Sequence, residues 1–120
     1  MSGSYSLNVV DASAPPRSEL WLVTDAAGEI LDLSAAAARL LNLSVRGARG
    51  RKLPTFLPED RPRLLRELLH AADGAIVQRS TVLQPRDRRA RRIRFDIAAE
   101  PQTPGARERL LWMLVLEDDR

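Results

Sequence analysis

The stretch of sequence that decides the fold is Leu20–Leu41, LWLVTDAAGEILDLSAAAARLL. It contains two short apolar runs, Leu20–Thr24 and Glu29–Leu33, which have the length and composition of β-strands. Asp25 and Gly28 stand between them, and both favour turns. An Asp carboxylate accepts hydrogen bonds from nearby backbone N–H groups, and Gly adopts positive φ without steric cost. The pattern predicts a hairpin with its turn at Asp25 and Gly28.

Two helices are predicted after this hairpin. Ser34 is a suitable N-cap for a helix that starts with four alanines. A second helix opens at Pro58-Glu59-Asp60-Arg61-Pro62, where proline and acidic residues suit the first turn, and ends at Asp73-Gly74. Between the two helices, Gly47 and Gly50 indicate a loop or broken short helices.

Three strand-like runs complete the pattern: Ala75–Leu83, Ala90–Glu100 and Leu110–Glu117. The second run alternates sharply between apolar and polar residues, as a half-buried strand does. Five strands, with the helices grouped between the second and third, predict an α+β fold with a five-stranded antiparallel sheet and helices packed on one face.

The composition indicates one domain. The 120 residues carry a formal net charge of +3, and Lys52 is the only lysine among 19 basic residues. Residues 1–19 are rich in Ser, Ala and Pro and are expected to form a flexible N-terminal arm, followed by a domain over residues 20–118. No stretch resembles a signal peptide or a membrane span, so we expect a cytoplasmic protein.

Three motifs, in this order, resemble the PAS family of sensory and interaction domains. They are an Asp-x-x-Gly turn at 24–30, the segment 40–44 with Gly47 and Gly50 after it, and Pro-Glu-Asp-Arg at 58–61. The likeness covers about residues 20–118. Two positions depart from the family's pattern: Ser34 stands where Asn is frequent, and Asn42 where Gly is frequent. Both residues retain the ability to cap a helix or to form a turn.

The resemblance implies a PAS-like sheet and a non-catalytic sensory or protein-interaction domain of a bacterial signalling or regulatory protein. Such domains act in two-component systems and transcription regulation, so we expect an output domain or signalling partner. The homodimer that we also expect rests on the apolar residues of the sheet, described below. The core between helices and sheet would hold a small ligand or be filled by side chains. The expected lining residues are Leu41, Phe56, Leu65, Leu69, Ile93 and Phe95.

Little in the sequence favours an enzyme or a known cofactor. His70 is the only histidine, and there is no cysteine. Some PAS domains bind haem through a histidine on the long helix. Here, however, His70 lies about 150° from the expected apolar stripe of that helix, so it should face water. The flavin-binding PAS class uses a cysteine for its photochemistry. We therefore expect no catalytic residue, no metal site, no haem and no cysteine-type flavin photochemistry.

The last strand is apolar on both faces, and so is the first. Because the helices can cover only one face of the sheet, the other needs a cover, and a large exposed apolar patch is unusual in a monomer. The candidates are the arm at Tyr5–Val10 and a second copy of the chain; the alternative is a partly exposed patch. The expected contact residues are Trp21, Trp112, Met113 and Leu114.

An alternative function rests on the Arg-rich hairpin 86–94, which contains six arginines. A basic α+β module could bind nucleic acid there through phosphate contacts. Few aromatic residues accompany the arginines, so base stacking is not favoured. The simpler interpretation is a solvated hairpin that Asp87 and Asp96 partly neutralise, and nucleic acid is not the partner we expect.

Overall fold

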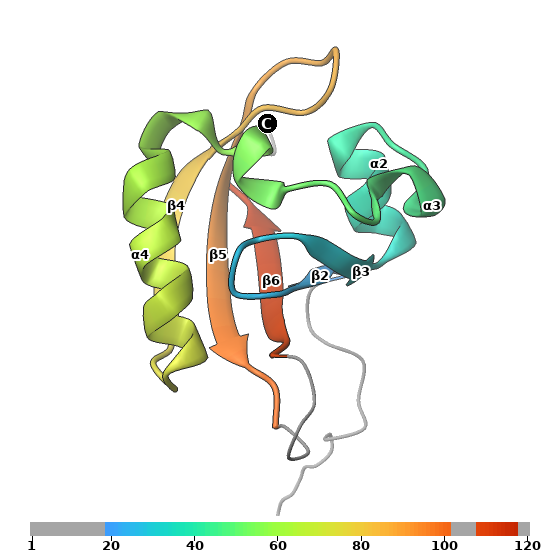
Figure 1. Ribbon diagram of the computed structural model, residues 1–120. Coiled ribbons are helices and arrows are strands. Elements are labelled where there is room, and N and C mark those ends of the chain that lie inside the picture. The colour runs from blue at the N-terminus through green and yellow to red at the C-terminus, as the bar shows by residue number, and fades with distance from the viewer. Residues whose placement is uncertain (1–18, 102–107, 118–120) are drawn as a thin grey trace, which may run out of the picture.

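The computed structural model describes residues 19–101 and 108–117, and these form one sheet with helices (Figure 1). The predicted arm therefore lies outside the described residues, except for Glu19. The elements are β2 (Leu20–Thr24), β3 (Ile30–Leu33), α2 (Ala35–Leu41), α3 (Val45–Ala48), the 3-10 helices η1 (Leu53–Phe56) and η2 (Pro58–Asp60), α4 (Arg61–Ala72), β4 (Val77–Leu83), β5 (Arg91–Ala99) and β6 (Leu110–Leu116). This order confirms the predicted α+β fold.

The five strands form one antiparallel sheet in the order β3-β2-β6-β5-β4. The first and last strands are neighbours at its centre, with Trp21 opposite Met113 and Leu22 opposite Trp112. Helix α4 packs along β4 and β5, while α2 and α3 lie at the other end of the sheet beside β2 and β3 (Figure 1). The helices thus cover one face, as the sequence predicts.

The turn between β2 and β3 is present at the predicted residues. The Asp25 Oδ1 atom accepts hydrogen bonds from the backbone N–H groups of Ala27 and Glu29, both at 2.9 Å. Gly28 has φ +89°, and a Cβ atom at this position would lie 2.7 Å from Pro54 Cδ. Gly28 is therefore required both by its backbone conformation and by the close approach of η1.

The caps of α2 follow from its sequence. The Ser34 Oγ atom accepts a hydrogen bond from the Ala37 N–H group at 3.0 Å, as an N-cap does. At the other end, Asn42 adopts the left-handed conformation with φ 63°, and its N–H group bonds to the carbonyls of Ala38 and Arg39. Asn tolerates this conformation better than most residues, so it can end the helix without glycine.

The core is centred on two aromatic rings. Trp112 and Phe95 are fully buried, and their ring centroids lie 5.2 Å apart at a tilt of 44°. The indole Nε1–H group of Trp112 donates to Thr24 Oγ1 at 3.0 Å, so the polar atom of the largest core residue has a partner. Leu22, Ile93 and the other inward residues of the sheet surround this pair.

The predicted orientation of the long helix is wrong. Its buried residues are Leu64, Leu68 and Ala71, whereas Leu65 and Leu69 are 44% and 59% exposed. The buried stripe is rotated by about 80° from the expected one. The sequence predicts a stripe of Leu65, Leu68, Leu69 and Ala72, of which the structure buries Leu68. The helix has leucines on both neighbouring stripes, so periodicity alone does not distinguish them. Packing of α4 against the sheet buries the stripe formed by Leu64, Leu68 and Ala71.

Candidate functional site

The region predicted as a ligand pocket is the core itself. Of the six predicted lining residues, Leu41, Phe56, Ile93 and Phe95 are buried together with Trp112. The other two, Leu65 and Leu69, lie on the exposed side of α4 and cannot line it. Large apolar side chains occupy the space between α4 and the sheet, and ligand binding in the core stays a prediction.

The only histidine is exposed, as predicted, although the prediction assumes a different buried stripe of the helix. His70 lies in the last turn of α4 and is exposed. Within the part of the chain that the structure describes, no group of three His, Cys, Asp or Glu side chains is arranged to hold a metal ion.

The first candidate surface is the face of the sheet that the helices do not cover. The pairing register places Trp21 beside Met113 and Val23 beside Leu111 on this face. Val115 follows on the same side of β6 and is 44% exposed. We call these five residues the outer sheet face. They form a continuous apolar strip across the two central strands. Val23 is buried, at 3% exposed, and Trp21, Leu111 and Met113 are half-buried.

Two of the predicted contact residues do not belong to this face. Trp112 and Leu114 are buried in the core, because side chains alternate along a strand and these two lie on the inner side of β6. Trp112 pairs with Leu22 and Ile97, which also point inward. The sequence could not separate the two sides of β6 because both are apolar. Of the predicted residues, Trp21 and Met113 remain as candidates for contact.

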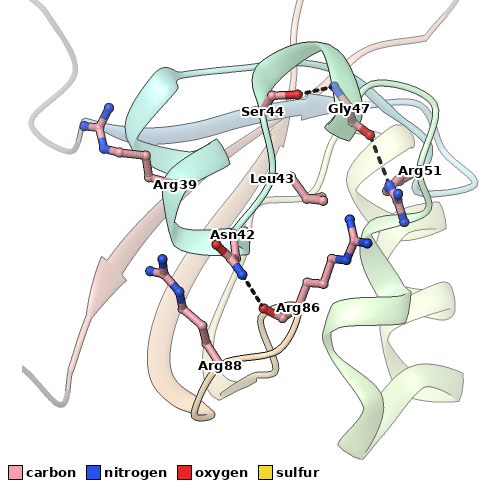
Figure 2. A pocket seen from close by; sticks show the side chains of 8 residues that line it. All are labelled: Arg39, Asn42, Leu43, Ser44, Gly47, Arg51, Arg86 and Arg88. Carbon is pink, nitrogen blue, oxygen red and sulfur yellow. Dashed lines mark hydrogen bonds between the residues drawn. The ribbon is translucent and has the colours of Figure 1, made fainter.

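The second candidate surface is a hollow between the end of α2, α3 and the loop that joins β4 to β5 (Figure 2). Its volume is about 460 Å³. We call it the arginine hollow, because four of its eight lining residues are arginines. The lining residues are Arg39, Asn42, Leu43, Ser44, Gly47, Arg51, Arg86 and Arg88.

The structure divides the predicted Arg-rich hairpin 86–94 between two sides of the molecule. Arg86 and Arg88 line the arginine hollow. Arg92 and Arg94 lie on β5 opposite Val82 and Ser80, on the side of the sheet that α4 leaves uncovered. The hairpin therefore does not present its arginines as a single surface.

Sequence reasoning missed the other two arginines of the hollow. Arg39 lies in the last turn of α2, and Arg51 follows α3. Both are far from the hairpin along the chain, and only the folded structure brings them to the same hollow. The segment from Asn42 to Gly47 connects α2 to α3 and is recognisable in the sequence. Nothing in the sequence, however, indicates that the hairpin contacts it.

The hairpin loop is fixed to the end of α2 by hydrogen bonds. The Asn42 Nδ2 atom donates to the Arg86 carbonyl at 2.8 Å (Figure 2), and the Arg86 N–H group donates to the Leu41 carbonyl at 3.1 Å. Within the loop, Gln84 Nε2 donates to the Arg88 carbonyl at 2.7 Å. The backbone positions of both hairpin arginines are therefore set by the fold.

The hollow is strongly positive. None of its eight lining residues is acidic. One carboxylate lies close by: Asp87 Oδ2 is 3.8 Å from Arg86 Nε, and the two side chains are 85% and 57% exposed. At that distance and exposure the pair contributes little. Among the described residues, Arg39 and Arg88 make no ion pair, so the hollow keeps most of its charge.

Comparison with known proteins places this architecture in a family. The family model of the PAS fold matches residues 19–118, which is nearly the whole chain. The chain belongs to the PAS family. No curated protein matches its sequence. The structure describes no helix that is both long and apolar enough to cross a membrane.

Solved PAS domains share the fold at low sequence identity. A PAS domain from Colwellia psychrerythraea has a TM-score of 0.73 and 17% identity, with 84% of this chain and 87% of that chain covered. The PAS domain of an HTR-like protein from Haloarcula marismortui has a TM-score of 0.71 and 15% identity, covering 84% and 83%. A domain of a sensory box sensor histidine kinase/response regulator from Geobacter sulfurreducens has a TM-score of 0.67 and 13% identity, covering 79% and 80%.

PAS domains are sensory and interaction modules of signalling proteins, and this chain is such a module. They are generally non-catalytic, and they commonly dimerise and connect to output domains. In this PAS domain the two candidate surfaces are the outer sheet face and the arginine hollow.

Proposed function

We propose that this PAS domain is a non-catalytic interaction domain of a bacterial signal-transduction protein, and that it forms a homodimer through the outer sheet face. The single observation that carries the proposal is the apolar strip across β2 and β6, with Trp21 beside Met113 at its centre. The large side chains of Phe95 and Trp112 in the middle of the core favour interaction over internal ligand sensing. The similar domain of the Geobacter sulfurreducens sensor histidine kinase supports the signalling context.

A symmetric dimer is the simplest cover for this strip. A two-fold interface buries the same patch on both copies, so a single apolar surface is sufficient. Full burial of an exposed large apolar side chain contributes about 1.5–3 kcal/mol, and the partly buried residues of the strip gain a fraction of that. Trp21, Leu111, Met113 and Val115 together could therefore support association at micromolar concentration.

Sedimentation equilibrium of the full chain tests the proposal, with an expected mass near twice 13.4 kDa. Met113→Arg should yield monomers, because a charge would have to enter a desolvated contact. Met113 lies opposite Asp96 on β5, so the new guanidinium has an anionic neighbour and the fold of the monomer should survive. The matched control is Leu65→Arg, which places the same charge on the exposed side of α4 and should leave the dimer intact.

Two outcomes would contradict the dimer. One is a monomeric wild-type chain. The other is association only after residues 1–18 are removed, which would make the N-terminal arm the native cover of the strip. Tryptophan emission gives an independent reading, since Trp112 is fully buried and a concentration-dependent change must come from Trp21.

A further inference from the structure

We propose that the arginine hollow is a binding site for a small, multiply charged anion carrying phosphate or carboxylate groups. The site lies at the end of α2, apart from the outer sheet face, so the inference does not depend on the proposed dimer. It rests on the charge of the hollow, on its rigid backbone and on its size.

The charge of the hollow favours an anionic partner. Arg39, Arg51, Arg86 and Arg88 border one hollow of about 460 Å³ without an acidic lining residue. Like charges held in a shared concave space repel one another, and a bound anion would relieve that repulsion. Guanidinium groups also fit phosphate and carboxylate well, because each can donate two parallel hydrogen bonds.

The arginines lie on two sides of Asn42. In the view of Figure 2, Arg39 and Arg88 are to its left, and Arg51 and Arg86 are to its right. Three separate segments of the chain thus contribute cations to one hollow. Four cations around one hollow suit a molecule with more than one anionic group.

The backbone around the hollow is already in place. The Asn42 side chain holds the Arg86 carbonyl at 2.8 Å, and the Arg51 Nε–H group donates to the Gly47 carbonyl at 3.0 Å (Figure 2). Ser44 Oγ accepts from the Gly47 N–H group at 2.9 Å, so its hydroxyl hydrogen remains as a donor. A site whose frame is fixed before binding loses less conformational entropy when the ligand arrives.

The size and lining favour a small molecule over a nucleic acid strand. Pockets for small molecules measure about 300–1,000 Å³, and the arginine hollow falls within this range. Single strands are usually bound by aromatic side chains on which bases stack, and no aromatic residue lines the hollow. Arg92 and Arg94 lie on the outer side of β5, so they do not extend the hollow into a longer basic track.

Calorimetric titration of the full chain at low ionic strength tests the site, with pyrophosphate and citrate as separate probes. We expect one anion per chain for at least one probe, and the probe that binds identifies the preferred anionic group. Arg39→Gln with Arg88→Gln, and separately Arg51→Gln with Arg86→Gln, should each weaken binding about tenfold or more, since each pair removes charge-assisted hydrogen bonds. All four side chains are exposed, so these variants should fold.

The matched control removes two exposed arginines outside the hollow, Arg46→Gln with Arg94→Gln, and has the same net charge as each test variant. Its affinity should stay within about twofold of the wild type. An equal loss of affinity in the control variant would show that the anion is attracted by net charge alone, and would contradict a specific site in the hollow. So would failure of both probes to bind, or binding of a single-stranded oligonucleotide in the absence of any binding by the small anions.

Discussion

The guanidinium group of Arg79 on β4 forms a forked ion pair with the carboxylate of Glu67 on α4. Arg79 Nε lies 2.8 Å from Oε1 and 2.7 Å from Oε2 of Glu67, and Nη2 lies 2.7 Å from Oε1. The same guanidinium stands 5.1 Å from the centre of the Phe95 ring. Both side chains are largely buried, so the pair joins helix to sheet at the edge of the core.

Glu67→Ala should lower the free energy of unfolding by about 3 kcal/mol, because it leaves the buried Arg79 without its carboxylate. Urea denaturation measures the change. The matched control is Arg63→Ala: Arg63 also contacts Glu67, at 3.4 Å, but its side chain is 61% exposed. Its loss should cost about 0.5 kcal/mol or less. Equal effects of the two substitutions would contradict a structural role for the Arg79 pair.

This ion pair lies in the part of the fold that the sequence could not predict, the contact of α4 with the sheet. The strands and turns follow from local patterns, and the structure has all five strands within two residues of their expected ends. The orientation of α4 depends instead on its packing against the sheet, and this packing includes the contact between Glu67 and Arg79, 12 residues apart in sequence. Both neighbouring stripes of the helix contain leucines, so only the packed sheet distinguishes them.

Leucine truncation on α4 tests the corrected orientation. Leu64→Ala should cost about 2–5 kcal/mol of unfolding free energy, because it opens a cavity in the core. Leu65→Ala should cost about 0.5 kcal/mol, as expected for an exposed position. The stripe expected from the sequence gives the opposite order, so thermal unfolding of the two variants decides between them.

The arginine hollow could not be predicted either, because it depends on contacts between segments that are far apart in the sequence. The sequence indicates a basic hairpin, but Arg39 and Arg51 come from the region around α2 and α3. The hydrogen bond that brings these parts together, from Asn42 to Arg86, spans 44 residues. Conversely, the outer sheet face was partly predictable, because alternation identifies two sides of β6 but not which one faces the helices.

Two glycines with nearly the same conformation separate backbone strain from steric contact. Gly28 and Gly50 have φ +89° and +87°, but a Cβ atom would clash with Pro54 only at Gly28. Gly50→Ala should therefore cost about 1–2 kcal/mol from the left-handed conformation alone. Gly28→Ala should cost about 1–3 kcal/mol more, because the methyl group must displace η1. Similar unfolding free energies for the two variants would contradict the close approach of Pro54.

Asn42 combines a helix cap with the anchor of the hairpin loop, and two substitutions separate these roles. Asn42→Gly keeps a residue suited to φ 63° but removes the hydrogen bond to the Arg86 carbonyl. Asn42→Ala removes the hydrogen bond and also adds strain at the cap. The expected losses of unfolding free energy are about 1 kcal/mol for the glycine variant and about 2–3 kcal/mol for the alanine variant.

Amide hydrogen exchange distinguishes the anchor from the cap. The Arg86 N–H group bonds to the Leu41 carbonyl, and it should exchange faster in both variants because the loop is less firmly held. The Asn42 and Leu43 N–H groups, which close the helix end, should exchange faster only in the alanine variant. Unchanged exchange at Arg86 in the glycine variant would show that the backbone hydrogen bond alone holds the loop. In that case the Asn42 side chain would not be what positions Arg86 and Arg88 at the hollow.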